Sequence, residues 1–299
     1  MNDRLSFQTT VCLVAFLLTA CGSADPVDPQ RYVDSDAIAQ TMIDNLSRSN
    51  TLRKVADIDH SRLGHEAGSP MPPARVLIFS DARMEARLIQ SNPLVALDLP
   101  LRVLTFEQGA GGPAKVIYNS FDYLVSRYQL DPGQTSTLRK AYENGFAKVT
   151  QGLPAEAITS FSRDEMQPDG IVTIESPYGF AETLMRVSTA IEAQNDAKYF
   201  GRVNFQADAA KQGIDIPPSH MILFGAPGPG GKAMADAPTL GLDGFCQKLL
   251  VWQAGDGRTF LSFNDLLALA ERQETNKTIA LRIINFRLNK TFMDALSED

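Results

Sequence analysis

Cysteine is scarce in this chain of 299 residues, which contains only Cys12, Cys21 and Cys246. The first lies inside an apolar N-terminal segment and the second follows that segment directly. A chain processed at this point would keep Cys246 as its single free thiol, which excludes an intramolecular disulfide and a cysteine-rich metal site. The fold must therefore depend on its apolar core, and 44% of the residues are apolar.

Runs of basic residues are also missing. Lys and Arg number 28 against 35 Asp and Glu, for a net charge of −7. Without a basic run or a cluster of basic and aromatic residues, binding to nucleic acid is disfavoured. The chain holds three histidines, and no Ser-His-Asp, paired-carboxylate or metal-ligand spacing stands out. The sequence therefore predicts no identifiable catalytic residue, metal or cofactor.

Long apolar runs are missing too, because the N-terminal run Val11–Ala20 ("VCLVAFLLTA") has only ten residues. Crossing a bilayer takes about 20 apolar residues, so residues 1–20 are interpreted as a signal peptide. Its end, Leu18-Thr19-Ala20-Cys21, is similar to the bacterial lipobox, in which the cysteine is acylated and becomes the mature N-terminus. The alternative is an ordinary cleavage site beside an incidental cysteine.

Lipidation of Cys21 would determine where in the cell the protein is located. Bacterial lipoproteins carry more than one acyl chain, and stable anchoring takes at least two membrane signals. Gly22 rather than Asp follows the cysteine, which resembles the pattern sorted to the outer membrane, and residues 21–36 are rich in Asp and Pro like a tether. The sequence thus predicts a lipid-anchored envelope protein, at the outer membrane and facing the periplasm.

The chain repeats itself at an offset of 145 residues, which indicates a tandem duplication. We expect one copy at 37–130, a helical linker at 131–168 and a second copy at 169–275. The matching pairs are Pro72-Pro73 with Pro217-Pro218, Phe79 with Phe224, Pro93 with Pro238, Leu97-Asp98 with Leu242-Asp243 and, after an insertion and a compensating shorter turn, Asn119 with Asn264.

Each copy has the pattern of a mixed α and β domain. In the second copy, residues 170–176 alternate like a strand, and the apolar residues of 180–191 recur at helical spacing. Gly255-Asp256-Gly257 is typical of a hairpin turn between two apolar strands, and a helix is expected at 265–272. We predict an α+β fold of two similar small sheet-and-helix domains, packed as a pseudo-two-fold tandem.

The first copy lacks a counterpart to the strand at 170–176. The C-terminal residues 283–296 ("IINFRLNKTFMDAL") align with 171–184, so we expect a strand and short helix at 276–299. One hypothesis is that this tail returns to cover the exposed sheet edge of the first copy. The alternative is that the tail is a strand extending the second copy.

Several of the repeated segments resemble the family called domain of unknown function 302. In the first copy they are "IDH" (58–60), "VLIF" (76–79), "LDLPLRVLTF" (97–106) and "YN" (118–119). In the second they are "GIVTIESPY" (170–178), "IPPSHMILFGAPGPG" (216–230) and "LLVW…SFND". The resemblance implies a small α+β domain that associates in pairs, without an established activity.

Each copy keeps family-like features that the other has lost. The first retains Asp59-His60 and Leu97–Pro100, while the second retains the glycine-containing segment from Gly225 to Gly228. Two symmetric sites would leave this pattern if they had merged into one composite site after duplication. Drift of a structural scaffold would leave it as well.

The segment "FGAPGPGGKA" invites comparison with a phosphate-binding loop. Ala226 stands where that motif needs its first glycine, and Ala233 where it needs a hydroxyl for Mg²⁺, so a nucleoside-triphosphate loop is excluded. A weaker ligand site or a plain tight turn remains. The candidate binding residues are Asp59, His60, Asp98, Gly225, Pro227, Gly228, Gly230 and Lys232.

Structural roles compete with these assignments. His60 can serve as a local hydrogen-bonding residue, and Cys246 is expected to be a buried structural thiol. Asp98 and Asp243 recur in both copies and suit a turn or strand cap, and Asn119 and Asn264 are expected to cap helices.

Three classes of function remain open. The preferred one is a lipid-anchored protein that binds a partner protein or a small ligand at the groove between the copies. The second is an enzyme or ligand carrier with a composite site of His60, Asp98 and the segment Gly225–Gly231. The third is a purely structural envelope protein, without a pocket or an exposed apolar patch.

Overall fold

The computed structural model describes residues 29–109, 111–161 and 170–298. The expected signal peptide, Cys21 and the first part of the tether lie outside this range. The last part of the expected tether is folded, because Pro29–Tyr32 forms a 3₁₀ helix and α1 begins at Val33. Tyr32 is only 2% exposed and lies under the guanidinium of Arg62, which holds this segment on the domain.

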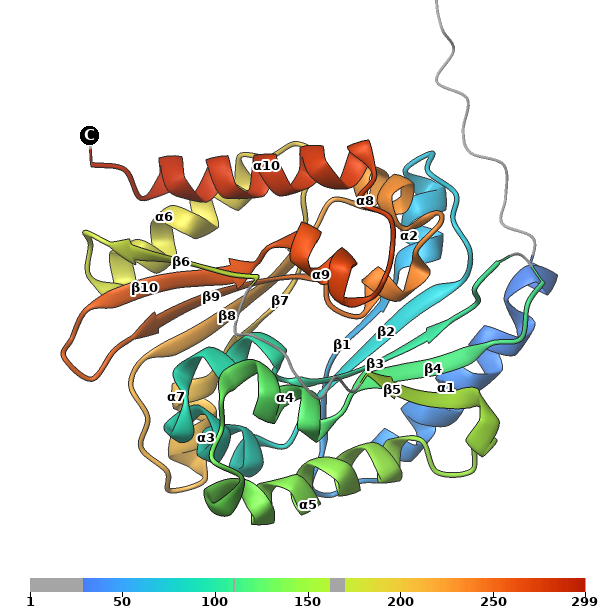
Figure 1. The fold of residues 1–299 in the computed structure, drawn as a ribbon, viewed down its shortest axis with the longest axis horizontal. Coiled ribbons are helices and arrows are strands. Elements are labelled where there is room, and N and C mark those ends of the chain that lie inside the picture. The colour runs from blue at the N-terminus through green and yellow to red at the C-terminus, as the bar shows by residue number, and fades with distance from the viewer. Residues whose placement is uncertain (1–28, 110, 162–169, 299) are drawn as a thin grey trace, which may run out of the picture.

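Two five-stranded sheets form the framework (Figure 1). In each sheet, the four strands that belong to the repeat pair in an antiparallel manner in the same order. Sheet A has the order β1 (Arg53–Asp59), β2 (Ala74–Ser80), β3 (Leu101–Phe106), β4 (Lys115–Asn119) and β5 (Ile158–Phe161). Sheet B has the order β7 (Lys198–Asn204), β8 (Ser219–Gly225), β9 (Gln247–Gln253), β10 (Thr259–Asn264) and β6 (Ile171–Ser176).

The helices also come in equivalent pairs, and most begin at a side chain that accepts a hydrogen bond from the first turn. Those of the first copy are α1 (Val33–Ser47), α2 (His60–Glu66), α3 (Ala82–Ser91), the 3₁₀ helix η2 (Pro93–Asp98), α4 (Phe121–Tyr128) and α5 (Pro132–Val149). Those of the second are α6 (Phe180–Glu192), α7 (Phe205–Lys211), α8 (Pro227–Met234), the 3₁₀ helix η4 (Pro238–Gly241), α9 (Leu266–Arg272) and α10 (Ile279–Ala295). Among the helices that the structure describes, none combines the length and the apolar composition of a transmembrane segment.

The helices and sheets form layers. α1 and α5 cover the outer face of sheet A, and α6 and α10 cover that of sheet B, while the inner faces turn toward each other (Figure 1). On β3, alternation sends Leu101 toward α5 and the next residue, Arg102, toward the second copy.

The two copies contact each other reciprocally. α2 packs against α8, and the equivalent pair α7 and α3 packs in the same way. The segment η2 lies against β8 and β9, while its counterpart η4 lies against β2 and β3. This exchange of equivalent contacts confirms the expected pseudo-two-fold tandem of two α+β domains.

The C-terminal tail differs from both expectations. Residues 279–295 form helix α10, capped by the side chain of Thr278, and this helix packs on α6, α8 and α9 of its own copy. Its apolar residues at 281, 284, 288 and 292 are buried at helical spacing, which a strand could not achieve. The edge of sheet A is instead covered by β5, which pairs with β4 in parallel.

The expected helical linker is partly a repeated element. α5 contacts α1, α3 and α4, and α10 contacts the equivalent helices α6, α8 and α9. Phe146 of α5 packs edge-on against Phe79, at 5.6 Å between ring centroids, and Phe292 of α10 packs edge-on against Phe224 at 5.9 Å. The repeated unit therefore extends to 149 in the first copy and to 295 in the second.

We expect Phe146→Ala and Phe292→Ala each to lower the free energy of unfolding by about 3–5 kcal/mol, because each removes a buried ring and leaves a cavity. Urea unfolding followed by circular dichroism measures the loss. The exposed substitution Lys140→Ala on α5 serves as the control and should change stability little. A loss below about 1 kcal/mol for Phe292→Ala would contradict the packing of α10.

Candidate functional site

A cluster of charged side chains is buried where the two copies meet. Lys248 of β9 donates to Asp98 of η2 at 3.0 Å and to Asp243, which follows η4, at 2.6 Å. The side chains of Lys248 and Asp98 are 0% exposed and that of Asp243 is 2% exposed. One ammonium therefore joins a carboxylate from each copy, out of contact with solvent.

Polar side chains of both copies complete this cluster. Arg127 of α4 donates to Asp98 at 2.6 Å and to the side-chain oxygen of Asn264 in the second copy at 2.5 Å. Asn119 of β4 donates to Asp243 at 2.9 Å. Because these bonds cross the interface in both directions, they fix the position of one copy against the other.

The electrostatics of the cluster follow from burial and pairing. Burial alone would raise the pKa of Asp98, but Arg127 and Lys248 outweigh it and hold that pKa well below its usual range. Burial lowers the pKa of Lys248, and the two neighbouring carboxylates oppose this effect. Two carboxylates, one ammonium and one guanidinium thus form a balanced buried set.

Arg102 stands apart from this balance. It precedes Val103 as Lys248 precedes Leu249, so the two cations occupy equivalent strand positions. Arg102 is 4% exposed and donates to the carbonyl oxygen of Cys246 at 3.5 Å, but its Nε and Nη2 have no hydrogen-bond partner within the described residues. Both strands therefore carry a cation, but only Lys248 bridges two carboxylates.

The two cations should therefore respond differently to replacement by methionine. We expect Lys248→Met to cost about 3–5 kcal/mol, because it removes the shared partner of two buried carboxylates. Arg102→Met should be neutral or stabilising, because it removes a buried charge whose Nε and Nη2 have no hydrogen-bond partner among the described residues. Urea unfolding of both variants tests this, and the opposite ranking would contradict the assigned roles.

The structure places Asp59 and His60 at the start of α2. Asp59 caps this helix and binds Arg62 at 2.5 Å, so it is not the partner of the neighbouring histidine. His60 is buried, with Nε2 at 3.1 Å from the carbonyl oxygen of Gly241 in the second copy. Burial lowers the pKa of His60 to about 4, which makes it a neutral residue of the interface at pH 7.

The glycine-containing segment is a helix rather than a loop or tight turn. Pro227, Gly228 and Gly230 belong to α8, and Lys232 on the same helix is exposed. A Cβ atom on Gly231 would meet the backbone oxygen of Ser69, which follows α2. Small residues are therefore needed here because two helices of different copies approach closely.

The structure brings α2 and α8 together, so His60 and the glycine segment share one interface. Asp98 lies in the charged cluster, and Gly225 ends β8. A binding role for these residues stays a prediction. Cys246 is a buried free thiol, as expected.

The expected capping role of Asn119 and Asn264 is wrong. Helices α4 and α9 are capped by the next residues, Ser120 and Asp265. The asparagines instead point into the charged cluster, where Asn119 binds Asp243 and Asn264 accepts from Arg127. Two features of the sequence could have indicated this cluster. Both asparagines recur in the repeat, and each copy carries a cation inside an apolar strand.

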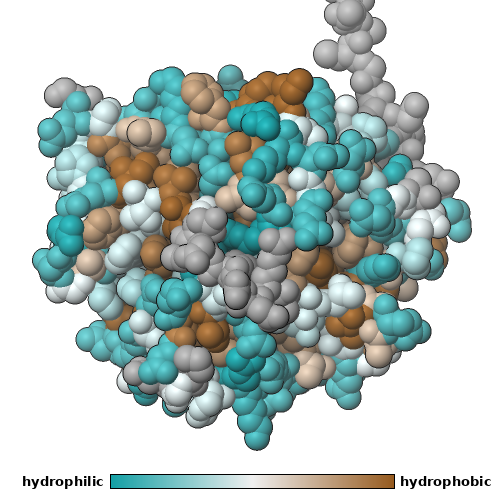
Figure 2. All heavy atoms as spheres, in the orientation of Figure 1, coloured by the Kyte–Doolittle hydropathy of each residue, from teal (hydrophilic) through white to brown (hydrophobic). Residues whose placement is uncertain are grey.

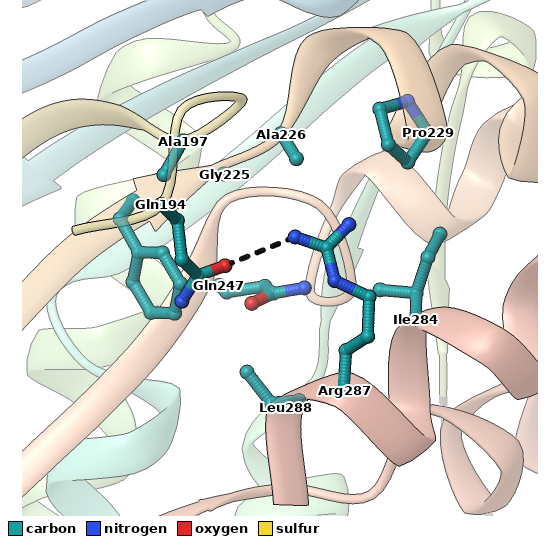
Figure 3. Close-up of a pocket in the computed structure, with 10 residues that line it drawn as sticks. Gln194, Ala197, Gly225, Ala226, Pro229, Gln247, Ile284, Arg287 and Leu288 are labelled. Carbon is teal, nitrogen blue, oxygen red and sulfur yellow. Dashed lines mark hydrogen bonds between the residues drawn. The ribbon is translucent and has the colours of Figure 1, made fainter. Parts of the chain in front are cut away.

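A small pocket lies beside the glycine segment, on the outer side of sheet B (Figure 3). Gly225, Ala226 and Pro229 line one side of it, and Arg287 of α10 reaches across to Gln194 at 3.4 Å. Its volume of about 30 Å³ suits one or two water molecules. Within the described residues, no group of three His, Cys, Asp or Glu side chains could hold a metal ion.

Replacing His60 should change how stability depends on pH. The pKa of His60 is about 4 in the folded chain and 6.5 in the unfolded chain. Between these pH values only the unfolded chain binds the proton, so stability falls as pH drops from 6.5 to 4. We expect His60→Phe, the residue found at the equivalent position 205, to remove roughly 3 kcal/mol of this loss.

The readout is the difference between parent and variant at each pH. Glu85 acts in the opposite direction, because burial raises its pKa to about 8 and so makes stability fall as pH rises from 4.5 to 8. That contribution cancels in the difference. Parallel pH profiles for parent and variant would show that His60 is not buried in a neutral form.

A family model described as "Domain of unknown function DUF302" matches residues 31–145 and 172–286. Curated relatives include the fluoride-specific ion channel FluC 1 of Brucella suis biovar 1, which is 38% identical over 103 residues, 34% of this chain and 40% of the relative. FluC 2 of Brucella melitensis biotype 1 matches at the same identity, over 37% of its length. The chain thus spans about two fifths of the length of these relatives or less.

Among solved structures, the chain is similar to a DUF302 protein from Bacillus stearothermophilus. The two are 18% identical, with a TM-score of 0.36, over 43% of this chain and 96% of the other.

Proposed function

The chain belongs to the family described as domain of unknown function DUF302, and we propose that this member is a lipid-anchored protein of the bacterial cell envelope that acts by binding. One observation carries the proposal of binding rather than catalysis. The ionisable residues at the centre of the interface, among them Asp98, Asp243 and Lys248, are buried and paired with one another. These residues stabilise the contact between the two copies. A binding partner would therefore contact an outer surface.

The position of the binding surface follows from the same interface. The sequence predicts a partner or ligand at the groove between the copies. The centre of that region is occupied by the charged cluster, and its flanks by the contacts of α2 with α8 and of α3 with α7. A ligand entering there would have to separate buried ion pairs, which is costly. An outer surface is therefore the better candidate.

The Brucella relatives support a place beside a membrane. Their matched 103 residues belong to proteins named as fluoride-specific ion channels. Sequence similar to a stretch of about a third of this chain is thus covalently part of proteins with that name. A lipid on Cys21 would bring this chain to a membrane by a different route.

A ligand carrier is the second candidate. A groove of about 630 Å³ lies between α3 and α5, within the size range of small-molecule sites. Leu138 and Ala141 contribute apolar surface to it. Two arginines, Arg83 and Arg87, against one carboxylate, Asp81, give it a positive balance that suits an anionic ligand with an apolar part. Native mass spectrometry after gentle extraction distinguishes the two, because only the carrier should retain a small molecule.

The anchor is tested by the mass of the mature chain. We expect the chain purified from membranes to begin at Cys21 and to carry acyl chains. Cys21→Ser should abolish the modification, and Cys12→Ser, a change inside the signal segment, should leave the mature mass unchanged. A mature chain with an unmodified Cys21, or one that begins elsewhere, would overturn the proposed anchor.

A further inference from the structure

Helix α10 carries an unusual amount of exposed apolar surface. Ile279, Ile283, Phe286 and Met293 are 77%, 55%, 68% and 60% exposed, and we call these four residues the α10 stripe. Their spacing of four, three and seven residues puts them on one side of the helix, opposite its buried face. Figure 2 shows brown spheres along the top edge of the molecule, where Figure 1 places α10.

The first copy shows that the fold does not require such a stripe. α5 occupies the equivalent place on sheet A and buries Phe146 as α10 buries Phe292. The exposed face of α5 is polar, with residues Ser136, Lys140, Glu143, Asn144 and Lys148. Large apolar side chains exposed to water contribute nothing to folding, so the difference between the two helices indicates contact with another surface.

The charges of α10 favour an anionic surface. Within Ile279–Ala295 there are three basic residues, Arg282, Arg287 and Lys290, and one acidic residue, Asp294, which gives +2 on a chain whose net charge is −7. Lys290 continues the line of the stripe between Phe286 and Met293 and pairs with Asp294 at 2.6 Å. Arg287 pairs with Asp196 at 2.8 Å, and Arg282 lies beside the stripe. Among the described residues, Arg282 has a hydrogen bond to a backbone oxygen but no carboxylate partner.

We propose that the α10 stripe lies against the surface of an anionic phospholipid bilayer, with its apolar side chains among the acyl chains and the basic residues at the headgroups. An apolar helix face flanked by basic residues is the pattern of helices that lie in a membrane interface. Each Lys or Arg near an anionic membrane surface adds to the attraction between the protein and the membrane. The proposal deepens the proposed function, since it says how the anchored domain is oriented.

A short tether would keep the domain close to the membrane. Cys21 and Pro29 are eight residues apart, which span at most about 28 Å when extended. α10 is also in the outermost layer of the second copy, with no other element outside it (Figure 1).

Fluorescence quenching by lipid tests the contact directly. Trp252 is the only tryptophan, so Trp252→Phe gives a silent background for single probes. In that background, Phe286→Trp places a probe in the stripe, and Lys140→Trp places a matched control on α5. The full chain is reconstituted into vesicles of phosphatidylethanolamine and phosphatidylglycerol with brominated acyl chains. We expect emission from the F286W probe to be quenched at least twofold more than that from the K140W control.

The outcomes separate this proposal from the anchor. A chain acylated at Cys21 whose two probes are quenched equally keeps the anchor and overturns the contact of α10. If the chain purified from membranes carries no acyl chain, the anchor is overturned. Strong quenching of F286W in that chain would still support the contact of α10. If both quenching and acylation are absent, both proposals are wrong.

Self-association would also overturn the lipid contact. In that case the chain would form a concentration-dependent dimer in analytical ultracentrifugation, and the double change Ile283→Ser and Phe286→Ser would abolish it. We expect instead the same sedimentation for the parent and the double variant. Both side chains are exposed, so the thermal unfolding midpoint should change little and shows that the variant is folded.

Discussion

The bridge from Lys248 to Asp98 and Asp243 is the constraint on which the arrangement of the two copies depends. Inside the protein, where the dielectric constant is low, these pairs attract strongly, but each charge is costly if its partner leaves. Asp98 belongs to the first copy and Lys248 to the second, so separating the copies would leave each copy with a charge that has lost its partner. The interface is therefore closed by electrostatics as well as by helix packing, and it does not resemble a groove that opens for a ligand.

Fusion of the two copies explains why this interface is asymmetric. In a dimer of identical chains, each residue appears twice and must suit both positions. Here Lys248 bridges two carboxylates while its counterpart Arg102 binds a carbonyl oxygen, and His60 stands where the second copy has Phe205. One chain can give each position its own residue, so a single bridging cation suffices at the centre.

The sequence predicted the repeat, the α+β class and most strands, because these follow from local patterns such as the paired prolines and the apolar strand residues. It failed for the tail, where "IINFRL" has strand-like composition but its buried positions follow a helical period. It also failed for the charged cluster, because Lys248 and its partner Asp98 are 150 residues apart. Contacts of that kind depend on how sheets pack, which periodicity does not encode.

The same duplication separates residues that hold the fold from residues that are free to change. Phe146 and Phe292 are retained under equivalent helices because each fills the space over its sheet, and a smaller residue would leave a cavity. On the outside of these helices packing imposes no such requirement, and there the copies have diverged to Lys140 and Glu143 in one and Phe286 in the other. An internal repeat thus acts as its own control. Exposed apolar residues that one copy has and the other lacks are therefore not required by the fold.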